Sequence, residues 1–155
     1  RGYYALIRSP RITSDGKDTS AIFGFTNSLI ELIRRERPTH LAVVFDVGEA
    51  SVRTADFSDY KANRSETPEA IKIAIPYIHR MLEAMNVPIL GVEGYEADDV
   101  IGTIACKAEK EGYTTFMVTP DKDFAQLVTD RIKIYKPGLK CGDVEILGVE
   151  EVKVK

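Results

Sequence analysis

The sequence contains few cysteines, no long apolar run and no glycine-rich phosphate loop. Its two cysteines, Cys106 and Cys141, are too few for a disulfide framework or a cysteine-based zinc cluster, so a reducing compartment is expected. No run approaches the roughly 20 apolar residues that cross a bilayer, and no secretory signal is expected at the N-terminus. With 155 residues, 44% of them hydrophobic and 29% charged, the chain has the size and composition of one globular domain.

The net charge of −3 conceals a split between the two halves of the chain. Residues 1–80 contain 12 basic and 10 acidic residues, whereas residues 81–155 contain 9 basic and 14 acidic ones. Such an asymmetry favours a charged partner or a metal site, without distinguishing between them.

Helical and extended patterns alternate along the chain. Helices are expected at about 19–37, 69–85, 96–111, 121–128 and from 150 onward, and strands at 40–45, 87–90, 114–118, 132–135 and 144–147. Pro76 predicts a kink in the second helix, or two helices end to end. This alternation predicts an α/β fold with a mostly parallel central sheet covered on both faces, in which ligands bind outside the carboxyl ends of the strands.

Six carboxylates fall at the predicted ends of strands or at the entry to a helix. Two strands and one helix entry supply them: Asp46 after one strand, Asp121 and Asp123 after another, and Glu96, Asp98 and Asp99 at the helix. In a parallel sheet they would share one edge, where their charges repel one another unless cations lie between them. Mg²⁺ and Mn²⁺ prefer oxygen ligands, and two such ions about 3.5–4 Å apart can clamp a phosphodiester.

A simpler interpretation is that each carboxylate caps a helix. Aspartate after a strand is a common N-cap, and Asp121 in particular could cap the helix that follows it. For any single residue we favour capping. Capping does not require paired acidic residues at three places on one edge, so the six together favour a metal site.

Residues 48–67 form a polar segment that begins next to the acidic edge. Arg53, Lys61 and Arg64 could neutralise nucleic-acid phosphates, and Tyr60 could stack on a base. An ordinary solvated loop is the alternative for such a segment. Its position beside Asp46 favours contact with a substrate.

Four motifs in order resemble the 5′→3′ exonuclease domain of bacterial DNA polymerases I, within the flap endonuclease superfamily. They are Phe45-Asp46, Tyr60-Lys61-Ala62-Asn63-Arg64, Gly94-Tyr95-Glu96-Ala97-Asp98-Asp99 and Thr119-Pro120-Asp121-Lys122-Asp123. The resemblance implies a PIN-like, resolvase-like fold and metal-dependent hydrolysis of DNA at 5′ ends or flaps, as in primer removal and repair.

The same resemblance implies roles for individual residues. Asp46, Glu96, Asp98 and Asp99 match ligands of a first divalent cation, and Asp121 and Asp123 lie nearer a second, with Mg²⁺ expected and Mn²⁺ also suitable. Lys61 and Arg64 match basic residues of an arch that positions the scissile phosphate. Arg1 and Arg53 match DNA-contacting positions.

The resemblance also implies a setting for the chain. We expect a nuclease domain truncated at both ends, covalently joined to the remainder of a polymerase, monomeric and located in the bacterial cytoplasm. The isolated segment could then be inactive. Two alternatives remain: a topoisomerase–primase type domain, which also uses a glutamate and an Asp-x-Asp pair, and a metal-loaded DNA-binding module without catalysis.

Overall fold

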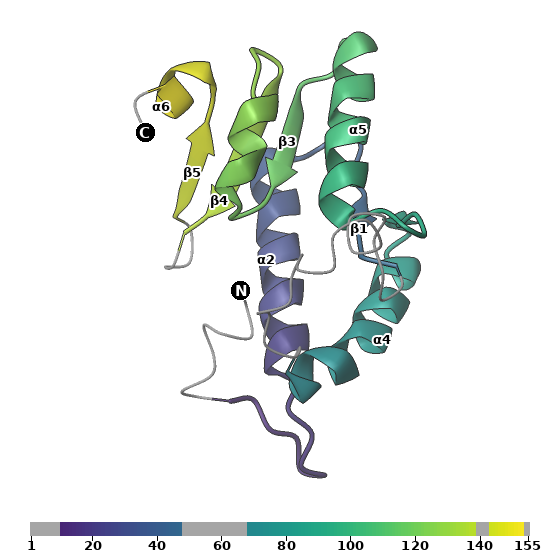
Figure 1. Cartoon of the computed structure of the whole chain (residues 1–155). Helices are drawn as coiled ribbons and strands as arrows, with labels where there is room; N and C mark the ends of the chain where they lie inside the picture. The colour runs from purple at the N-terminus through teal and green to yellow at the C-terminus, as the bar shows by residue number, and fades with distance from the viewer. Residues whose placement is uncertain (1–9, 48–67, 139–142, 154–155) are drawn as a thin grey trace, which may run out of the picture. The chain divides into compact units, whose positions relative to one another are not determined.

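A computed structural model describes residues 10–47, 68–138 and 143–153 (Figure 1). The helices are α2 (Ser20–Glu36), α4 (Glu69–Ala84), α5 (Ala97–Lys110), the 3₁₀ helix η1 (Lys122–Leu127) and α6 (Val149–Lys153). The strands are β1 (Val43–Val44), β2 (Ile89–Leu90), β3 (Thr115–Val118), β4 (Ile132–Pro137) and β5 (Val144–Leu147). The alternation of helices and strands confirms the predicted α/β class.

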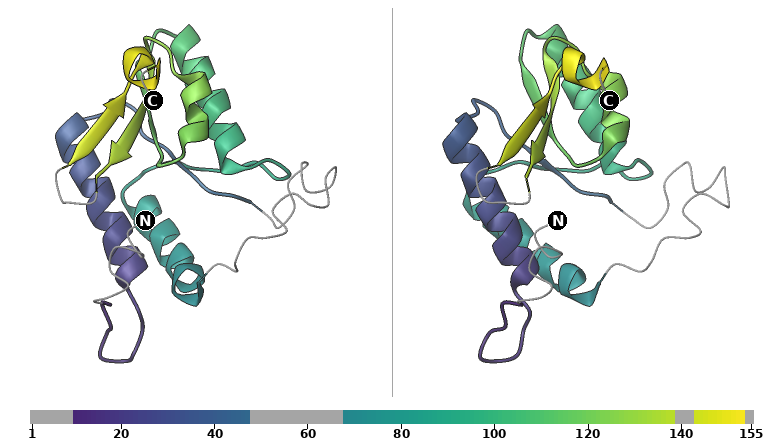
Figure 2. Two further views of the ribbon diagram at one scale, coloured as in Figure 1. Left: turned by 60° about the vertical axis from the view of Figure 1, so that its left-hand side comes forward. Right: turned by 90° about the vertical axis from the view of Figure 1, so that its left-hand side faces the viewer.

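The chain divides into two compact units, with the boundary inside β1. The first unit contains α2, α4 and β2, and α2 and α4 lie side by side in it (Figure 2). Their apolar stripes face each other through buried residues on both helices: Leu29 and Leu32 on α2, and Ala74, Ile78 and Leu82 on α4. Pro76 lies inside α4, which continues through it as one α-helix.

The second unit contains a three-stranded sheet in the order β3-β4-β5, with α5 packed against it. Strand β3 pairs with β4 in parallel, Thr115 opposite Ile132, as the alternating pattern predicts. Strand β5, at the end of this sheet, pairs with β4 antiparallel, Ile134 opposite Leu147, and so departs from the parallel pairing. Only six residues separate Pro137 from Val144, and a parallel connection needs a crossover of a dozen or more.

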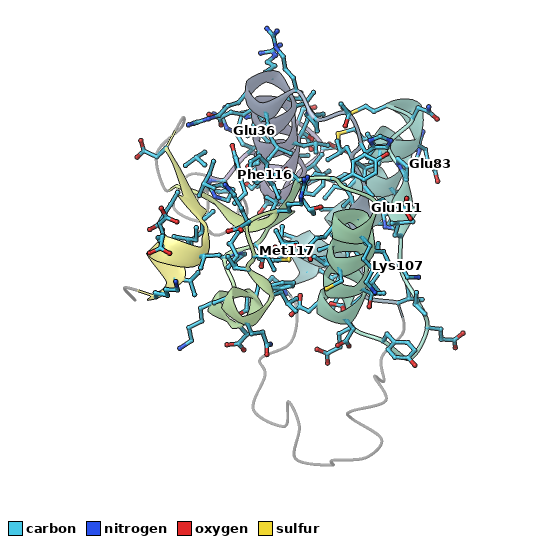
Figure 3. All side chains as sticks on the ribbon, turned by 90° about the horizontal axis from the view of Figure 1, so that it is seen from above. Glu36, Glu83, Lys107, Glu111, Phe116 and Met117 are labelled. Carbon is cyan, nitrogen blue, oxygen red and sulfur yellow. The ribbon has the colours of Figure 1, made fainter. Side chains whose placement is uncertain are left out.

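The core of the second unit lies between the sheet and α5. Its buried side chains come from α5, η1 and all three strands of the sheet: Ala105, Phe124, Met117, Ile132, Ile134 and Leu147. Figure 3 shows Met117 between the sheet and α5, with Lys107 on the outer side of that helix. No helix in the described ranges is both long and apolar enough to cross a membrane.

Helix α2 begins differently from the sequence expectation. The pattern predicts Thr19 or Ser20 as the cap, but the Thr19 side chain makes no capping hydrogen bond. Instead, the Ser20 amide donates to Asp18 Oδ1 at 2.9 Å, while Ser20 Oγ accepts from the Arg11 amide at 2.8 Å. Hydrogen bonds from the side chain and backbone of Ser20 lower the pKa of Asp18 below 3.8.

We predict that Asp18→Ala lowers the free energy of unfolding by about 1 kcal/mol at neutral pH, because an orphan amide at the start of α2 loses its acceptor. Since the folded pKa lies below 3.8, the contribution is complete above the unfolded pKa and is lost as pH falls through the folded value. Urea unfolding across this range should therefore show the gap between wild type and variant closing in acid. A gap independent of pH would contradict the assignment.

Candidate functional site

The carboxylate of Asp46 bridges two parts of the second unit that are distant in sequence. Asp46 follows β1, and its Oδ1 accepts a hydrogen bond from the Ala97 amide, the first residue of α5, at 2.7 Å. The first amides of a helix have no partner within the helix and carry partial positive charge, so they attract a carboxylate. This contact places the end of β1 at the N-terminus of α5.

Gly91 makes that approach possible. A Cβ atom at this position would overlap the Val47 side chain and lie 2.9 Å from the carbonyl oxygen of Phe45. The segment that carries Asp46 therefore passes against bare backbone. Sequence reasoning did not identify Gly91 as a site residue, although a glycine directly after a predicted strand was an available signal.

Glu96 and Asp99 hold each other at the start of α5. The Glu96 side chain accepts from the Asp99 amide and the Asp99 side chain accepts from the Glu96 amide, which forms a capping box. The second of these bonds measures 3.2 Å, and Glu96 is only 8% exposed. The three-residue spacing noticed in the sequence therefore fixes both carboxylates in orientation.

Asp121 is fixed by its own turn. Its Oδ1 accepts from the Asp123 amide at 2.9 Å, and it is the N-cap of η1. The Asp121 amide in turn donates to the hydroxyl of Thr119, which is 8% exposed, at 3.1 Å. Thr119 is thus a supporting residue that sequence reasoning included in a motif without giving it a role.

Asp98 differs from these carboxylates because it caps no helix: within the described residues, its side chain accepts no backbone hydrogen bond. Partial desolvation by surrounding atoms is the largest cause that raises the pKa of Asp98 above its ordinary value, although the residue is exposed at the surface. Four like charges add to the effect, in decreasing order Asp121, Asp46, Glu96 and Asp99. Four of the other five candidate ligands therefore lie close enough to Asp98 to disfavour its charged form.

The remaining candidates are placed less fully. Asp123 is exposed at the start of η1 and is not among the charges that act on Asp98. The candidate DNA contacts lie outside the described residues: Arg1, Arg53, Tyr60, Lys61 and Arg64.

The carboxylates lie close enough for their charges to repel one another, but they are not arranged to surround a metal ion. In the described part of the chain, no three Asp, Glu, His or Cys side chains are grouped so that they could hold a metal ion as they stand. Like charges separate without a cation, and backbone amides hold oxygens of Asp46, Asp99 and Asp121. An all-carboxylate set in which one member has a raised pKa nevertheless has the chemistry that suits a hard divalent cation.

We predict that substitutions at Asp46 separate its capping role from its charge. Asp46→Ala removes the acceptor for the Ala97 amide and should lower the free energy of unfolding by about 1 kcal/mol. Asp46→Asn keeps an acceptor of similar capping strength and should remain within a few tenths of the wild-type value. Equal destabilisation by both variants in urea unfolding would show that the bond does not stabilise the fold.

Substitution of Asp98, in contrast, is expected to increase the free energy of unfolding. Because charged neighbours and burial disfavour its ionised form, Asp98→Asn should raise the free energy of unfolding at neutral pH without divalent cations. The gain should be about 0.5 kcal/mol after solvent screening and should shrink at high salt. Asp130→Asn, at an exposed turn before β4, is the matched control and should leave stability unchanged. A loss of stability in Asp98→Asn would show that the neighbouring carboxylates do not disfavour the charge on Asp98.

Comparisons with known proteins agree on one family. The family model of the 5′-3′ exonuclease, N-terminal resolvase-like domain matches residues 1–155. DNA polymerase I of Mycobacterium tuberculosis is 42% identical over 137 residues, covering 88% of this chain and 15% of the relative. The 5′-3′ exonuclease of Aquifex aeolicus is 40% identical over 137 residues, covering 88% of this chain and 47% of the relative. The chain thus spans less than half the length of these relatives.

Solved structures of bacteriophage T5 nucleases share the fold. T5 5′-exonuclease with bound zinc ions gives a TM-score of 0.59 at 16% identity, covering 84% of this chain and 50% of that one. A T5 flap endonuclease in complex with DNA and metal ions gives 0.51 at 17% identity, covering 87% and 52%. The resemblance found in the sequence motifs is confirmed.

Proposed function

The chain belongs to the family of the 5′-3′ exonuclease N-terminal, resolvase-like domain. We therefore propose that it contains the active-site carboxylates of a 5′ nuclease. The reaction is hydrolysis of DNA phosphodiester bonds at 5′ ends or flaps, as in primer removal and DNA repair. The relatives support this activity through their names, DNA polymerase I and 5′-3′ exonuclease. In this proposal the domain is part of a DNA polymerase I chain, acts as a monomer and functions in the bacterial cytoplasm.

The observation that supports the proposal best is the gathering of four carboxylates, Asp46, Glu96, Asp99 and Asp121, near enough to Asp98 to raise its pKa. A protein gains no stability from crowding like charges, so such a cluster is more typical of a site that binds cations. The carboxylates come from the segment after β1, the start of α5 and the start of η1, all within the second unit. This is the strand-end position at which α/β folds bind ligands.

The six carboxylates would bind two divalent cations. Asp46, Glu96, Asp98 and Asp99 would hold one divalent cation, and Asp121 and Asp123 would contribute to a second, with Mg²⁺ the expected ion and Mn²⁺ a substitute. Bound cations of this kind supply hydroxide from water and neutralise charge on the phosphate. The backbone amides that hold Asp46, Asp99 and Asp121 orient these side chains in advance, so less conformational entropy is lost on binding.

DNA binding is assigned to the basic and aromatic residues of the motifs. Lys61 and Arg64 would position the scissile phosphate, while Arg1, Arg53 and Tyr60 would contact the DNA on either side. These assignments rest on the sequence resemblance. The T5 flap endonuclease solved with DNA supports a nucleic-acid partner for this fold.

We predict that the intact protein cleaves a 5′-flap DNA in the presence of Mg²⁺ and that Asp98→Asn slows cleavage by about a hundredfold or more, the scale of a single electrostatic group in an active site. Asp98 has no capping role, so the loss should occur without loss of fold. Asp130→Asn again serves as the control and should cleave at the wild-type rate.

A binding measurement separates the alternatives. Mg²⁺ should raise the thermal unfolding midpoint of the wild type but not of Asp98→Asn, because a ligand that binds only the folded state stabilises it. DNA binding without cleavage across a range of Mg²⁺ and Mn²⁺ concentrations would favour a non-catalytic metal-loaded module. Normal flap cleavage after substitution of both Lys61 and Arg64 would favour the topoisomerase–primase alternative.

A further inference from the structure

Three large apolar side chains lie exposed beside the carboxylates in the second unit. Val47 is 43% exposed, Val92 is 47% exposed and Tyr95 is 54% exposed. Val47 directly follows Asp46, and Tyr95 directly precedes Glu96. We call these three residues the apolar rim.

Close contacts connect the members of the rim to one another and to the acidic edge. Val47 lies against the bare Cα of Gly91, the residue before Val92. The Tyr95 amide donates to the Val92 carbonyl at 3.1 Å, which closes the turn between them. The Ala97 amide, two residues after Tyr95, donates to Asp46. The rim therefore borders the carboxylates from two chain segments, which are joined by the Val47–Gly91 contact and the hydrogen bond from the Ala97 amide to Asp46.

The turn before α5 explains why Tyr95 faces outward. Gly94 has φ +82°, a left-handed conformation that side chains rarely adopt, and the chain reverses there. Glu96 follows in extended backbone and is buried at 8% exposure, whereas its neighbour Tyr95 is exposed. A buried carboxylate that caps α5 and an exposed aromatic ring are therefore neighbours in the chain.

We propose that the apolar rim, centred on Tyr95, is a stacking platform for a nucleobase of the DNA strand whose phosphate would be held by divalent cations at the carboxylates. This proposal rests on the proposed function and adds a substrate contact to it. A base offers a flat π-face that stacks on tyrosine whatever its identity, which suits a nuclease that accepts many sequences. Stacking also adds affinity without charge, next to carboxylates that repel phosphates.

The size of the rim argues against a protein partner. Specific protein interfaces bury about 800 Å² on each side and involve some 20–30 residues per partner. Three side chains at one edge are far fewer than that. They match the footprint of a single base instead.

The experiment compares Tyr95→Ala, Tyr95→Phe and Tyr113→Ala in the intact protein. Tyr113 is the matched control, because it is 44% exposed and follows the opposite end of α5. Binding of a 5′-flap DNA is measured by fluorescence anisotropy with Ca²⁺ in place of Mg²⁺, and cleavage is measured separately with Mg²⁺. Tyr95→Ala should weaken binding roughly tenfold, whereas Tyr95→Phe and Tyr113→Ala should stay within about twofold of wild type.

A set of DNAs with one abasic position each identifies the stacked base. At the stacked position, removing the base should weaken wild-type binding by the same factor as Tyr95→Ala, and the two changes together should cost no more than either alone. Independent losses at every position would overturn the proposal, as would wild-type binding unchanged by any abasic site. This second result decides the matter even if Tyr95→Ala does not fold.

Failure of the inference and failure of the proposed function give different results. If the wild type does not cleave DNA with Mg²⁺, the proposed function is wrong. If it cleaves and Tyr95→Ala binds and cleaves equally well, only the stacking platform is wrong.

Discussion

The arrangement of the acidic edge depends on one hydrogen bond, from the Ala97 amide to the Asp46 carboxylate. It joins residues 51 positions apart and ties the end of β1 to the N-terminus of α5. A helix N-terminus provides unpaired amides and partial positive charge, so a carboxylate placed there is stabilised while like charges accumulate around it. Without a residue as small as glycine at position 91, the two segments could not approach closely enough to make this bond.

The sequence presents capping and metal binding as alternatives, but the capping that the structure shows is compatible with the proposed metal site. Asp46, Glu96, Asp99 and Asp121 each accept a hydrogen bond from a backbone amide. Those bonds stabilise helix starts and also fix the direction in which each carboxylate points. Asp98 has no such compensation, and the electrostatic strain of the cluster is concentrated on it. The fold would be more stable with an uncharged side chain in place of Asp98. Its charge is therefore better explained by function than by stability.

Local patterns predicted the helices and the position of the acidic edge, whereas tertiary contacts decided the remainder. The Glu96–Asp99 spacing and the apolar stripes depend only on helical periodicity, so they could be read directly from the sequence. The apolar run at 40–45 became only the two-residue strand Val43–Val44, since strand length depends on the partner it finds. The roles of Gly91 and Asp18 depend on which segment lies opposite, which periodicity does not encode.

The net charge of −3 depends on the six candidate metal ligands. Without these six residues the chain has 18 acidic and 21 basic residues, so the remainder of the chain is mildly basic. A polyanion approaching this domain would meet repulsion at the edge where cations are expected to bind, and bound cations would reverse the sign of that local field. The apolar rim lies at the same edge and contributes no charge of either sign. Affinity at this edge would therefore combine a term that requires divalent cations with a stacking term that does not, and the two terms should respond differently to salt.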